Sequence, residues 1–526
     1  VLVVVRNTAS VFRMREIRKL FYDDDRVTIR TTVADNSRYR FGADEQLASD
    51  RIRSLSWERA KQIPFDLILS SSADACLHEL NGPVIVFPHG AGHLKRPPDA
   101  DSGNEASDLL NRQLLHNGVP IADWHLLPGQ DSWDRMILGC PAIEKRSSIA
   151  GDPVAQQLRD HADLRDDYRA ALGLLPEQKL VVVASTWGPG SISGQSLDLP
   201  RRLVAELPAD EYRVAAIFHH NVVMHDGFED LQRRLHSAVE SGLILMPPED
   251  SWQATVIAAD CVLGDHGSML FYSADMAPVA VAAYDPTAYP QDGPAAAMVD
   301  AVSHLNFGMP LRPQVDRLLA APRLEAVRTI VDSTIDHKKD AAAEFRTKMY
   351  ETMGLPEPAG DAFLHLDMPK PVPARLTAVR AHSTIADDVE PTVTLARYPA
   401  AVTSSDTGEF LAVHTDDPDP RRRHSARVLI AAAGWTDLGE LLHHWPLCRI
   451  AVRALGAGEF LIRLSDGVEF VAITDSAAGA DEAAIIASGC YGFVHAKRPQ
   501  PSRFVVKCGD RTIAVELRTP ASHCPR

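Results

Sequence analysis

The pattern of apolar positions in the first 150 residues predicts a parallel β-sheet with helices between its strands. Short apolar runs, several rich in β-branched residues, predict buried strands at Val1–Val5, Val27–Val33, Phe65–Leu69 and Pro83–Phe87. Mixed helical spacing predicts helices at Val11–Phe21 and Ser54–Gln62. Alternating strands and helices are typical of βαβ units, so residues 1–150 are expected to form a Rossmann-like domain.

The same pattern starts again after a charged helical stretch at Pro153–Leu174. It predicts strands at Lys179–Ala184, Tyr212–Phe218, Leu243–Met246, Cys261–Leu263 and Pro278–Ala283. The segments Gly227–Ser241 and Ser251–Ala259 fit helices between these strands. We therefore expect a second Rossmann-like domain over residues 151–355. Ligands bind at the carboxyl ends of the strands in open α/β sheets, so the two domains are expected to enclose a cleft.

Beyond residue 355 the pattern changes again. The run Pro369–Pro373, Pro-Lys-Pro-Val-Pro, is typical of a stiff linker, which we place at 356–380. Short alternating strands follow at Arg427–Ala431, Glu459–Leu464 and Arg503–Lys507, and predict an accessory α+β domain over 381–526. The expected fold class is thus α/β, with two tandem Rossmann-like domains and an additional C-terminal α+β domain.

Composition narrows the range of partners. The chain has 526 residues, with 54 Lys and Arg against 70 Asp and Glu, and a net charge of −16. Such a surface repels polyanions, so we expect no nucleic-acid partner and no strong membrane binding, while the oligomeric state stays open. The one compact basic run, Arg421–Arg423, is expected to be a solvated loop. Seven scattered cysteines without a C-x-x-C pattern predict reduced thiols, a cytoplasmic location and no metal site.

The first cluster of candidate site residues follows the strand predicted at Pro83–Phe87. His89 lies at the tip of the turn and is followed by Gly90 and Gly92. A histidine can act as a general base because its ordinary pKa lies near 6.5, close to working pH. The two glycines form a supporting loop that lets a ligand approach the backbone. The alternative is a turn with an incidental histidine.

The second cluster, His219 and His220, follows the strand at Tyr212–Phe218. Paired histidines at a strand end can bind a phosphate, whereas a metal would need a third ligand at suitable spacing. Neighbouring side chains at a strand end point to opposite sides, so only one of the pair is expected to face the cleft. The alternative is that both are ordinary turn residues.

A third cluster, Asp265, His266, Gly267 and Ser268, links the strand at Cys261–Leu263 to a helix that starts near Gly267. The N–H groups and dipole of a helix start bind anions, so this segment suits a pyrophosphate. Ser185 and Thr186, which follow the first strand of the second domain, are a weaker candidate for the same role. The alternatives are a helix cap without a ligand and a plain turn.

In this order the clusters resemble the CDP-glycerol glycerophosphotransferases and the related teichoic-acid and capsule polymerases. The resemblance covers about residues 1–350. The matching segments are His89-Gly90, Gly139-Cys140-Pro141, His219-His220-Asn221, Leu245-Met246-Pro247, and Ala259-Asp260 through Asp265-His266-Gly267-Ser268. The chain departs from the family where Tyr-Ser becomes His266-Gly267 and where an acidic residue becomes Tyr272. The last segment is also similar to the Asp-Ser-Gly-Gly of UDP-N-acetylglucosamine 2-epimerases.

The resemblance implies a glycosyltransferase-B fold with an N-terminal acceptor domain and a nucleotide-donor domain. It implies metal-independent transfer of a polyol-phosphate or sugar from a nucleotide-diphosphate donor, CDP-glycerol-like or an NDP-sugar, to a hydroxyl acceptor. His89 and His219 would be catalytic, and Ser185, Thr186, His220, Asp265, His266, Gly267 and Ser268 would bind the phosphates. No cofactor is expected, because the nucleotide is a substrate. The alternatives are a UDP-sugar 2-epimerase or hydrolase and a catalytically silent nucleotide-binding module.

Overall fold

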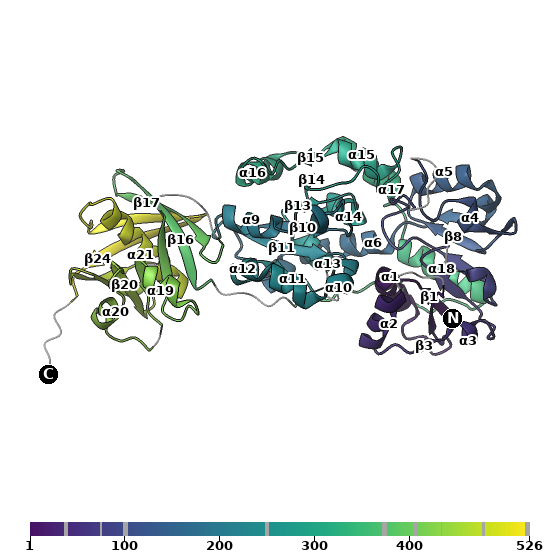
Figure 1. Ribbon diagram of the computed structural model, residues 1–526, viewed down its shortest axis with the longest axis horizontal. Helices are drawn as coiled ribbons and strands as arrows, with labels where there is room; N and C mark the ends of the chain where they lie inside the picture. Colours follow the sequence, from purple (N-terminus) through teal and green to yellow (C-terminus); the bar gives the residue numbers. More distant parts are fainter. Residues whose placement is uncertain are drawn as a thin grey trace.

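The structure is a computed structural model, and three bodies follow one another along its long axis (Figure 1). It describes residues 1–35, 40–73, 76–97, 104–247, 252–370, 376–402, 409–432, 434–475 and 479–520. The N-terminal sheet lies at one end, the second sheet in the middle and a β-barrel at the other end. Residues 371–375 of the predicted linker lie outside the described residues, as does Cys524.

The first body is a seven-stranded parallel sheet in the order β3-β2-β1-β4-β5-β8-β9. Its strands are β1 (Leu2–Val5), β2 (Arg30–Val33), β3 (Ser54–Leu55), β4 (Ile68–Ser70), β5 (Val84–Val86), β8 (Trp124–Leu127) and β9 (Ser147–Ile149). Its helices are α1 (Thr8–Arg18), α2 (Arg40–Ser49), α3 (Trp57–Ala60), α4 (Asn111–Leu114) and α5 (Gln130–Gly139), and β6 (Leu115–His116) pairs with β7 (Val119–Pro120).

All four strands predicted for this body are confirmed. The helix predicted from Ser54 is wrong at its start, because Ser54–Leu55 pairs with β2 as an edge strand and α3 begins only at Trp57. The strands β8 and β9 were not predicted, because Trp-His-Leu-Leu and Ser-Ser-Ile lack an unbroken apolar run.

The second body is a six-stranded parallel sheet in the order β12-β11-β10-β13-β14-β15. Its strands are β10 (Lys179–Ser185), β11 (Tyr212–Phe218), β12 (Ile244–Leu245), β13 (Cys261–Gly264), β14 (Val279–Val281) and β15 (Ser303–His304). The helices are α6 (Pro153–Asp160), α7 (Arg165–Ala171), α8 (Ile192–Gln195), α9 (Leu199–Glu206), α10 (His220–Asp226), α11 (Phe228–Arg234), α12 (His236–Glu240), α13 (Trp252–Ala258), α14 (Ser268–Met276), α15 (Pro294–Ala301) and α16 (Arg312–Ala320). The five predicted strands are confirmed as β10 to β14.

The chain then returns to the first sheet. Helix α17 (Glu325–Thr334) contacts both α14 and α5, and so bridges the two bodies. Helix α18 (Ala341–Met353) buries Phe345, Met349 and Tyr350 in the apolar core of the first sheet. The Phe345 ring lies 5.2 Å from the ring of Phe87, just before His89. Residues 341–353, which we placed in the second domain, therefore pack on the first.

The third body is a closed barrel of nine strands in the order β16-β17-β23-β24-β22-β21-β20-β19-β18. The strands are β16 (Ala378–Ala386), β17 (Thr392–Pro399), β18 (Phe410–His414), β19 (Val428–Ile430), β20 (Ile450–Gly456), β21 (Glu459–Leu464), β22 (Glu469–Ile473), β23 (Arg503–Cys508) and β24 (Arg511–Arg518). The helices are α19 (Pro420–Ser425), α20 (Leu438–His444) and α21 (Ala480–His495). The expected α+β domain is thus a β-barrel with helices, and its three predicted strands are confirmed as β19, β21 and β23.

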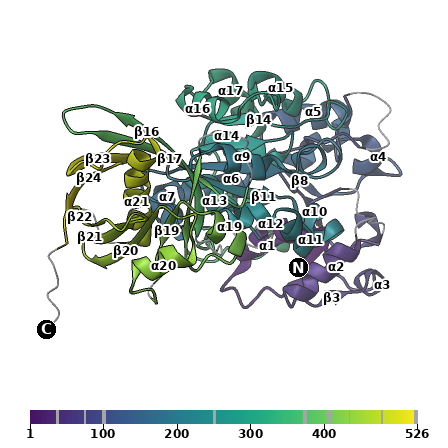
Figure 2. The same ribbon diagram turned by 60° about the vertical axis from the view of Figure 1, so that its left-hand side comes forward.

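Helix α21 runs inside the barrel, where Figure 2 shows it within the ring of strands. Every residue from Ala483 to Phe493 is buried, so this helix has no solvent-facing side. Small residues make the fit possible: a Cβ atom added to Gly489 would lie 2.7 Å from a methyl group of Val506. The helix therefore forms the core around which the strands close.

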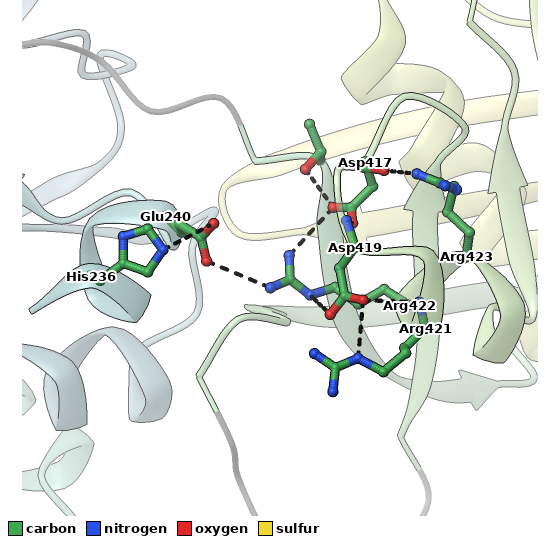
Figure 3. Close-up of polar contacts among 8 residues, drawn as sticks. His236, Glu240, Asp417, Asp419, Arg421, Arg422 and Arg423 are labelled. Carbon is green, nitrogen blue, oxygen red and sulfur yellow. Dashed lines mark hydrogen bonds and ion pairs between the residues drawn. The ribbon is translucent and has the colours of Figure 1, made fainter. Parts of the chain in front are cut away.

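Ionic contacts join the barrel to the second body. Arg397 of β17 binds the Asp210 carboxylate through its Nε, at 2.9 Å, and both side chains are buried. The basic run is a second contact: Arg421–Arg423 lies in helix α19 rather than in a solvated loop. Figure 3 shows Arg422 between Glu240 of α12, at 3.7 Å, and the barrel carboxylates of Asp417 and Asp419. The solvated-loop prediction is therefore wrong for Arg422, because tertiary contacts half-bury it.

Candidate active site

A cavity of about 390 Å³ lies where the carboxyl ends of the two sheets face each other. Its walls come from the loops after β5, β10, β11 and β13, as the parallel topology requires. Eight of the predicted site residues line this one cavity: His89, Gly90, Ser185, Thr186, His219, His220, Gly267 and Ser268. The structure thus brings together the three clusters and the Ser185-Thr186 segment, although His89 and Ser268 are 179 positions apart in the chain.

His89 lines the cavity and donates a hydrogen bond from one ring nitrogen, so the other nitrogen of the neutral ring carries no proton. Its imidazole hydrogen-bonds to the backbone of Ser71, which follows β4. The side chain is open to the cavity, but protein surrounds the cavity closely. This enclosure, together with the charge of Lys95, lowers the pKa of His89. A neutral imidazole with a free ring nitrogen is the form that accepts a proton.

His219 accepts a hydrogen bond from the backbone instead of donating one. It is the N-cap residue of α10, and its Nδ1 accepts a hydrogen bond from the Asn221 N–H at 3.1 Å. Burial and the charge of Lys95 lower its pKa well below the ordinary value, so the ring is neutral at pH 7. Because Nδ1 is an acceptor, the proton of the neutral ring sits on Nε2. His219 therefore offers an N–H donor.

The expectation that only one of the two adjacent histidines faces the cleft is wrong. Both line the cavity, because His219 caps α10 and His220 begins it, so the alternation of a strand does not apply. His220 stacks on Phe12 of α1, with ring centroids 3.7 Å apart and an interplanar angle of 15°. Burial lowers its pKa to about 3. His220 therefore acts mainly as an apolar contact between the two bodies.

The start of helix α14 forms the opposite wall. Its N-cap residue, Gly267, has no side chain, so the first N–H groups of α14 receive no side-chain cap. Ser268 meets Gly90 across the cleft: a Cβ atom on Gly90 would lie 2.4 Å from the Ser268 hydroxyl oxygen. Glycine at position 90 is therefore what allows the two bodies to approach here.

Three predicted site residues do not line the cavity. Asp265 lies beneath it and accepts hydrogen bonds from the backbone N–H of Thr186, at 2.8 Å, and of Gly267, at 3.2 Å. Burial raises the pKa of this carboxyl to about 6. His266 packs against Tyr289, with ring centroids 5.5 Å apart, and Gly92 lies in a turn with φ of 138°. Asp265 thus positions two cavity loops, while His266 and Gly92 belong to the surrounding packing.

Lys95 is a cavity residue that the sequence analysis missed. Its ammonium lies 5.5 Å from the centre of the Trp187 ring, across the cleft from its own loop. Other basic side chains of the wall form ion pairs with carboxylates: Arg13 binds Asp152 at 2.9 Å, and Lys19 binds Glu16 at 2.7 Å. Within the part of the chain that the structure describes, no carboxylate forms an ion pair with Lys95, although Asp265 acts on it at longer range.

Burial lowers the pKa of Lys95. An enclosed ammonium without an ion pair, beside a bare helix start, is an arrangement that favours a bound anion. No sequence signal pointed to Lys95, because it belongs to no motif and its position depends on the meeting of the two bodies.

Among the residues that the structure describes, no three His, Cys, Asp or Glu side chains gather into a group that could hold a metal ion. None of the helices formed by these residues is long and apolar enough to span a membrane.

The chain is similar to several solved structures. The wall teichoic acid polymerase TagF is 14% identical over 67% of this chain and 88% of that chain, with a TM-score of 0.47. HepE of Anabaena, solved with UDP and glucose, is 12% identical over 67% and 99%, with a TM-score of 0.36. S. aureus MnaA, solved with UDP, is 12% identical over 69% and 99%, with a TM-score of 0.42. These structures include a member of the polymerase family that the sequence resembles.

No protein-family model and no curated protein matches the chain.

The substitution His220→Phe tests the packing role of His220. Phenylalanine keeps the stack on Phe12 but cannot titrate. The pKa of His220 is about 3 in the folded protein and about 6.5 in an unfolded chain, so the unfolded state binds the proton first as the pH falls. The stability due to the neutral ring is therefore present above about pH 6.5 and is lost as the pH falls toward 3.

We expect the melting temperature of the wild type to fall more steeply between pH 7 and pH 4 than that of His220→Phe. Thermal melts across this range measure the effect, with the exposed His236→Phe as the matched control. Parallel curves for wild type and His220→Phe would contradict the packing role.

Proposed function

We propose that this chain is a metal-independent transferase. It moves a polyol-phosphate or sugar from a nucleotide-diphosphate donor, either CDP-glycerol-like or an NDP-sugar, to a hydroxyl acceptor. The observation that carries the proposal is the pair of imidazoles in one cleft. His89 provides the unprotonated nitrogen of a neutral ring as a proton acceptor, and His219 provides an N–H as a donor.

The two histidines divide the reaction between them. His89 takes the proton of the acceptor hydroxyl as its oxygen attacks the donor, at phosphorus for a polyol-phosphate or at the anomeric carbon for a sugar. The bond to the leaving phosphate oxygen breaks, and negative charge grows on the nucleotide product. The His219 N–H and the ammonium of Lys95 lie where they can stabilise that charge.

The donor phosphates fit the wall formed by the second body. Gly267, Ser268 and Thr186 line the cavity, the start of α14 has no side-chain cap, and Lys95 reaches the cavity from the first body. Backbone N–H groups at a helix start and one lysine are a common cradle for a diphosphate. Asp265 holds two of these loops in place from beneath. The His89 side of the cleft is left for the acceptor.

The proposal includes a cytoplasmic setting and no cofactor beyond the nucleotide substrate. The structure joins none of the described cysteines in a disulfide: Cys76, Cys140, Cys261, Cys448, Cys490 and Cys508. Scattered thiols of this kind stay reduced in the cytoplasm.

Kinetics of His89→Ala and His219→Ala test the catalytic roles. Loss of a positioned acid or base costs roughly 10²–10⁴-fold, so each substitution is expected to lower kcat by this order while the melting temperature stays near that of the wild type. Nucleotide release is measured with CDP-glycerol and with UDP- and GDP-sugars, with and without a polyol acceptor. His236→Ala, an exposed histidine, is the control. Near-normal turnover of both variants would exclude the histidine mechanism.

The same assay separates the alternatives. Release of UDP that does not depend on any acceptor would favour the epimerase or hydrolase. Binding without turnover of any donor would favour the silent nucleotide-binding module.

Donor affinity tests the assigned diphosphate site. Ser268→Asp places a carboxylate at the start of α14 and is expected to weaken nucleotide binding by roughly 100-fold or more. Lys95→Gln removes one charge-assisted contact, worth about 1.5–3 kcal/mol, and is expected to weaken binding by roughly 10- to 100-fold. Calorimetry with CDP, UDP and GDP measures both, with the exposed Ser333→Asp as the control. Wild-type affinity in both variants would place the nucleotide elsewhere.

Chelation tests the absence of a metal from the mechanism. Lys95 and the N–H groups of α14 offset the diphosphate charge that a divalent cation would otherwise neutralise. We therefore expect turnover to be unchanged by EDTA. Loss of activity that Mg²⁺ or Mn²⁺ restores would show that the reaction needs a metal.

A further inference from the structure

A second cavity, of about 240 Å³, lies between the second body and the barrel. It is at the amino ends of the strands of the second sheet, the end opposite to the catalytic cleft. Arg213, in this cavity, is the second residue of β11, whereas His219 follows the last residue of the same strand. At about 3.3 Å per residue the two positions are on the order of 20 Å apart. The two cavities are therefore separate.

Two carboxylates and two guanidinium groups in the wall of this cavity neutralise one another. Arg397 binds Asp210 at 2.9 Å and Asp481 at 2.8 Å. Arg511 binds Asp481 at 2.8 Å and also binds Asp210. Both carboxylates are thus shared between the same two arginines. This network leaves no acidic side chain of the wall for a further cation.

Arg213 is that further cation. Its Nε is shut off from solvent and has no hydrogen-bond partner, and among the described residues no side chain forms an ion pair with its guanidinium. Burial is the only influence on its pKa, which is lowered. Arginine cannot lose its proton in a protein, so the charge stays where it is. A half-buried charge without a partner loses part of its hydration, and an anion would offset this cost.

Apolar side chains form another part of the wall, beside the polar Gln178, Thr377 and His414. The side chains of Leu175 from the second body and of Leu376, Val379 and Ile430 from the barrel line the same space. A guanidinium presents a planar fork of donors that matches a carboxylate or a phosphate. We propose that this cavity binds a small organic anion, whose carboxylate or phosphate pairs with Arg213 and whose apolar part lies against the barrel.

Such a ligand would link two parts of the chain. The wall is formed by the second body on one side and by the barrel on the other, so a bound anion contacts both. Binding is expected to stabilise the folded arrangement of the second body and the barrel by mass action. This site is independent of the proposed transferase activity, because it shares no residue with the catalytic cleft.

Thermal melts of the full chain at constant ionic strength test the proposal, with butyrate and butyl phosphate as probes. We expect a saturable rise in melting temperature of about 2–4 °C at about ten times the dissociation constant. The stronger of the two responses identifies the carboxylate or the phosphate. Butylammonium, which has the same apolar chain and the opposite charge, is expected to give no rise.

Arg213→Met is the decisive variant. It is expected to abolish the response to both anions. In buffer without either anion it should melt at or above the wild-type temperature, because it removes an uncompensated, half-buried charge. Arg328→Met, at an exposed arginine of α17 whose side chain is 74% accessible, is the matched control and should change neither property. If Arg213→Met does not fold, Arg213→Lys keeps the charge and should raise the butyrate concentration needed by about tenfold.

Three results would overturn the proposal. The wild type shows no saturable response to either anion, or the response survives Arg213→Met. The third such result is that Lys95→Gln abolishes the response of the melting temperature to the anions, because the anions would then bind in the catalytic cleft. The cleft assignments and this site can therefore fail separately.

Discussion

The cleft between the two sheets depends on the return of the chain to its first sheet. Helix α18 buries Phe345, Met349 and Tyr350 there, and each large apolar side chain removed from water contributes about 1.5–3 kcal/mol. This packing, together with α17 between α5 and α14, holds the carboxyl ends of the two sheets face to face. The loops that carry His89 and His219 would otherwise belong to separate bodies. The contact of Gly90 with Ser268 shows how close this approach is.

Within the cleft, burial decides the protonation of the histidines. Enclosure lowers the pKa of His89, His219 and His220, and the positive charge of Lys95 lowers the pKa of His89 and His219 further, so these rings are neutral at pH 7. The hydrogen bonds that the rings make to the backbone then set their roles. The neutral His89 ring is then an acceptor and the neutral His219 ring a donor, and these are the two roles that the proposed transfer to a hydroxyl requires.

The two cavities share one electrostatic feature. Each contains a basic side chain that no carboxylate of the described chain pairs with: Lys95 in the cleft and Arg213 beside the barrel. Around each of them the other basic groups of the wall form ion pairs, as Arg13 does with Asp152 and Arg397 with Asp210. A chain with a net charge of −16 thus keeps two enclosed positive positions, and both suit an anionic ligand.

The sequence by itself determined the strands and the loops that follow them. Runs such as Tyr212–Phe218 are recognisable because a buried parallel strand needs an unbroken apolar segment, and polar residues after such a strand lie at the functional edge. The cleft position of His89, His219 and Ser268 was predictable for this reason. Their roles in catalysis stay predictions. The short strands β8 and β9 were missed because their composition is mixed.

Only the tertiary structure decided the rest. Contacts between distant segments determine the return of α18 to the first sheet and the closure of the barrel around α21. They also determine the stacking of His220 on Phe12 and the positions of Lys95 and Arg213. Local periodicity reports which face of an element is buried but not which element covers it. Whether a charged side chain forms an ion pair depends on which element covers it. Lys95 and Arg213 could therefore be recognised as cations without an ion pair only from the tertiary structure.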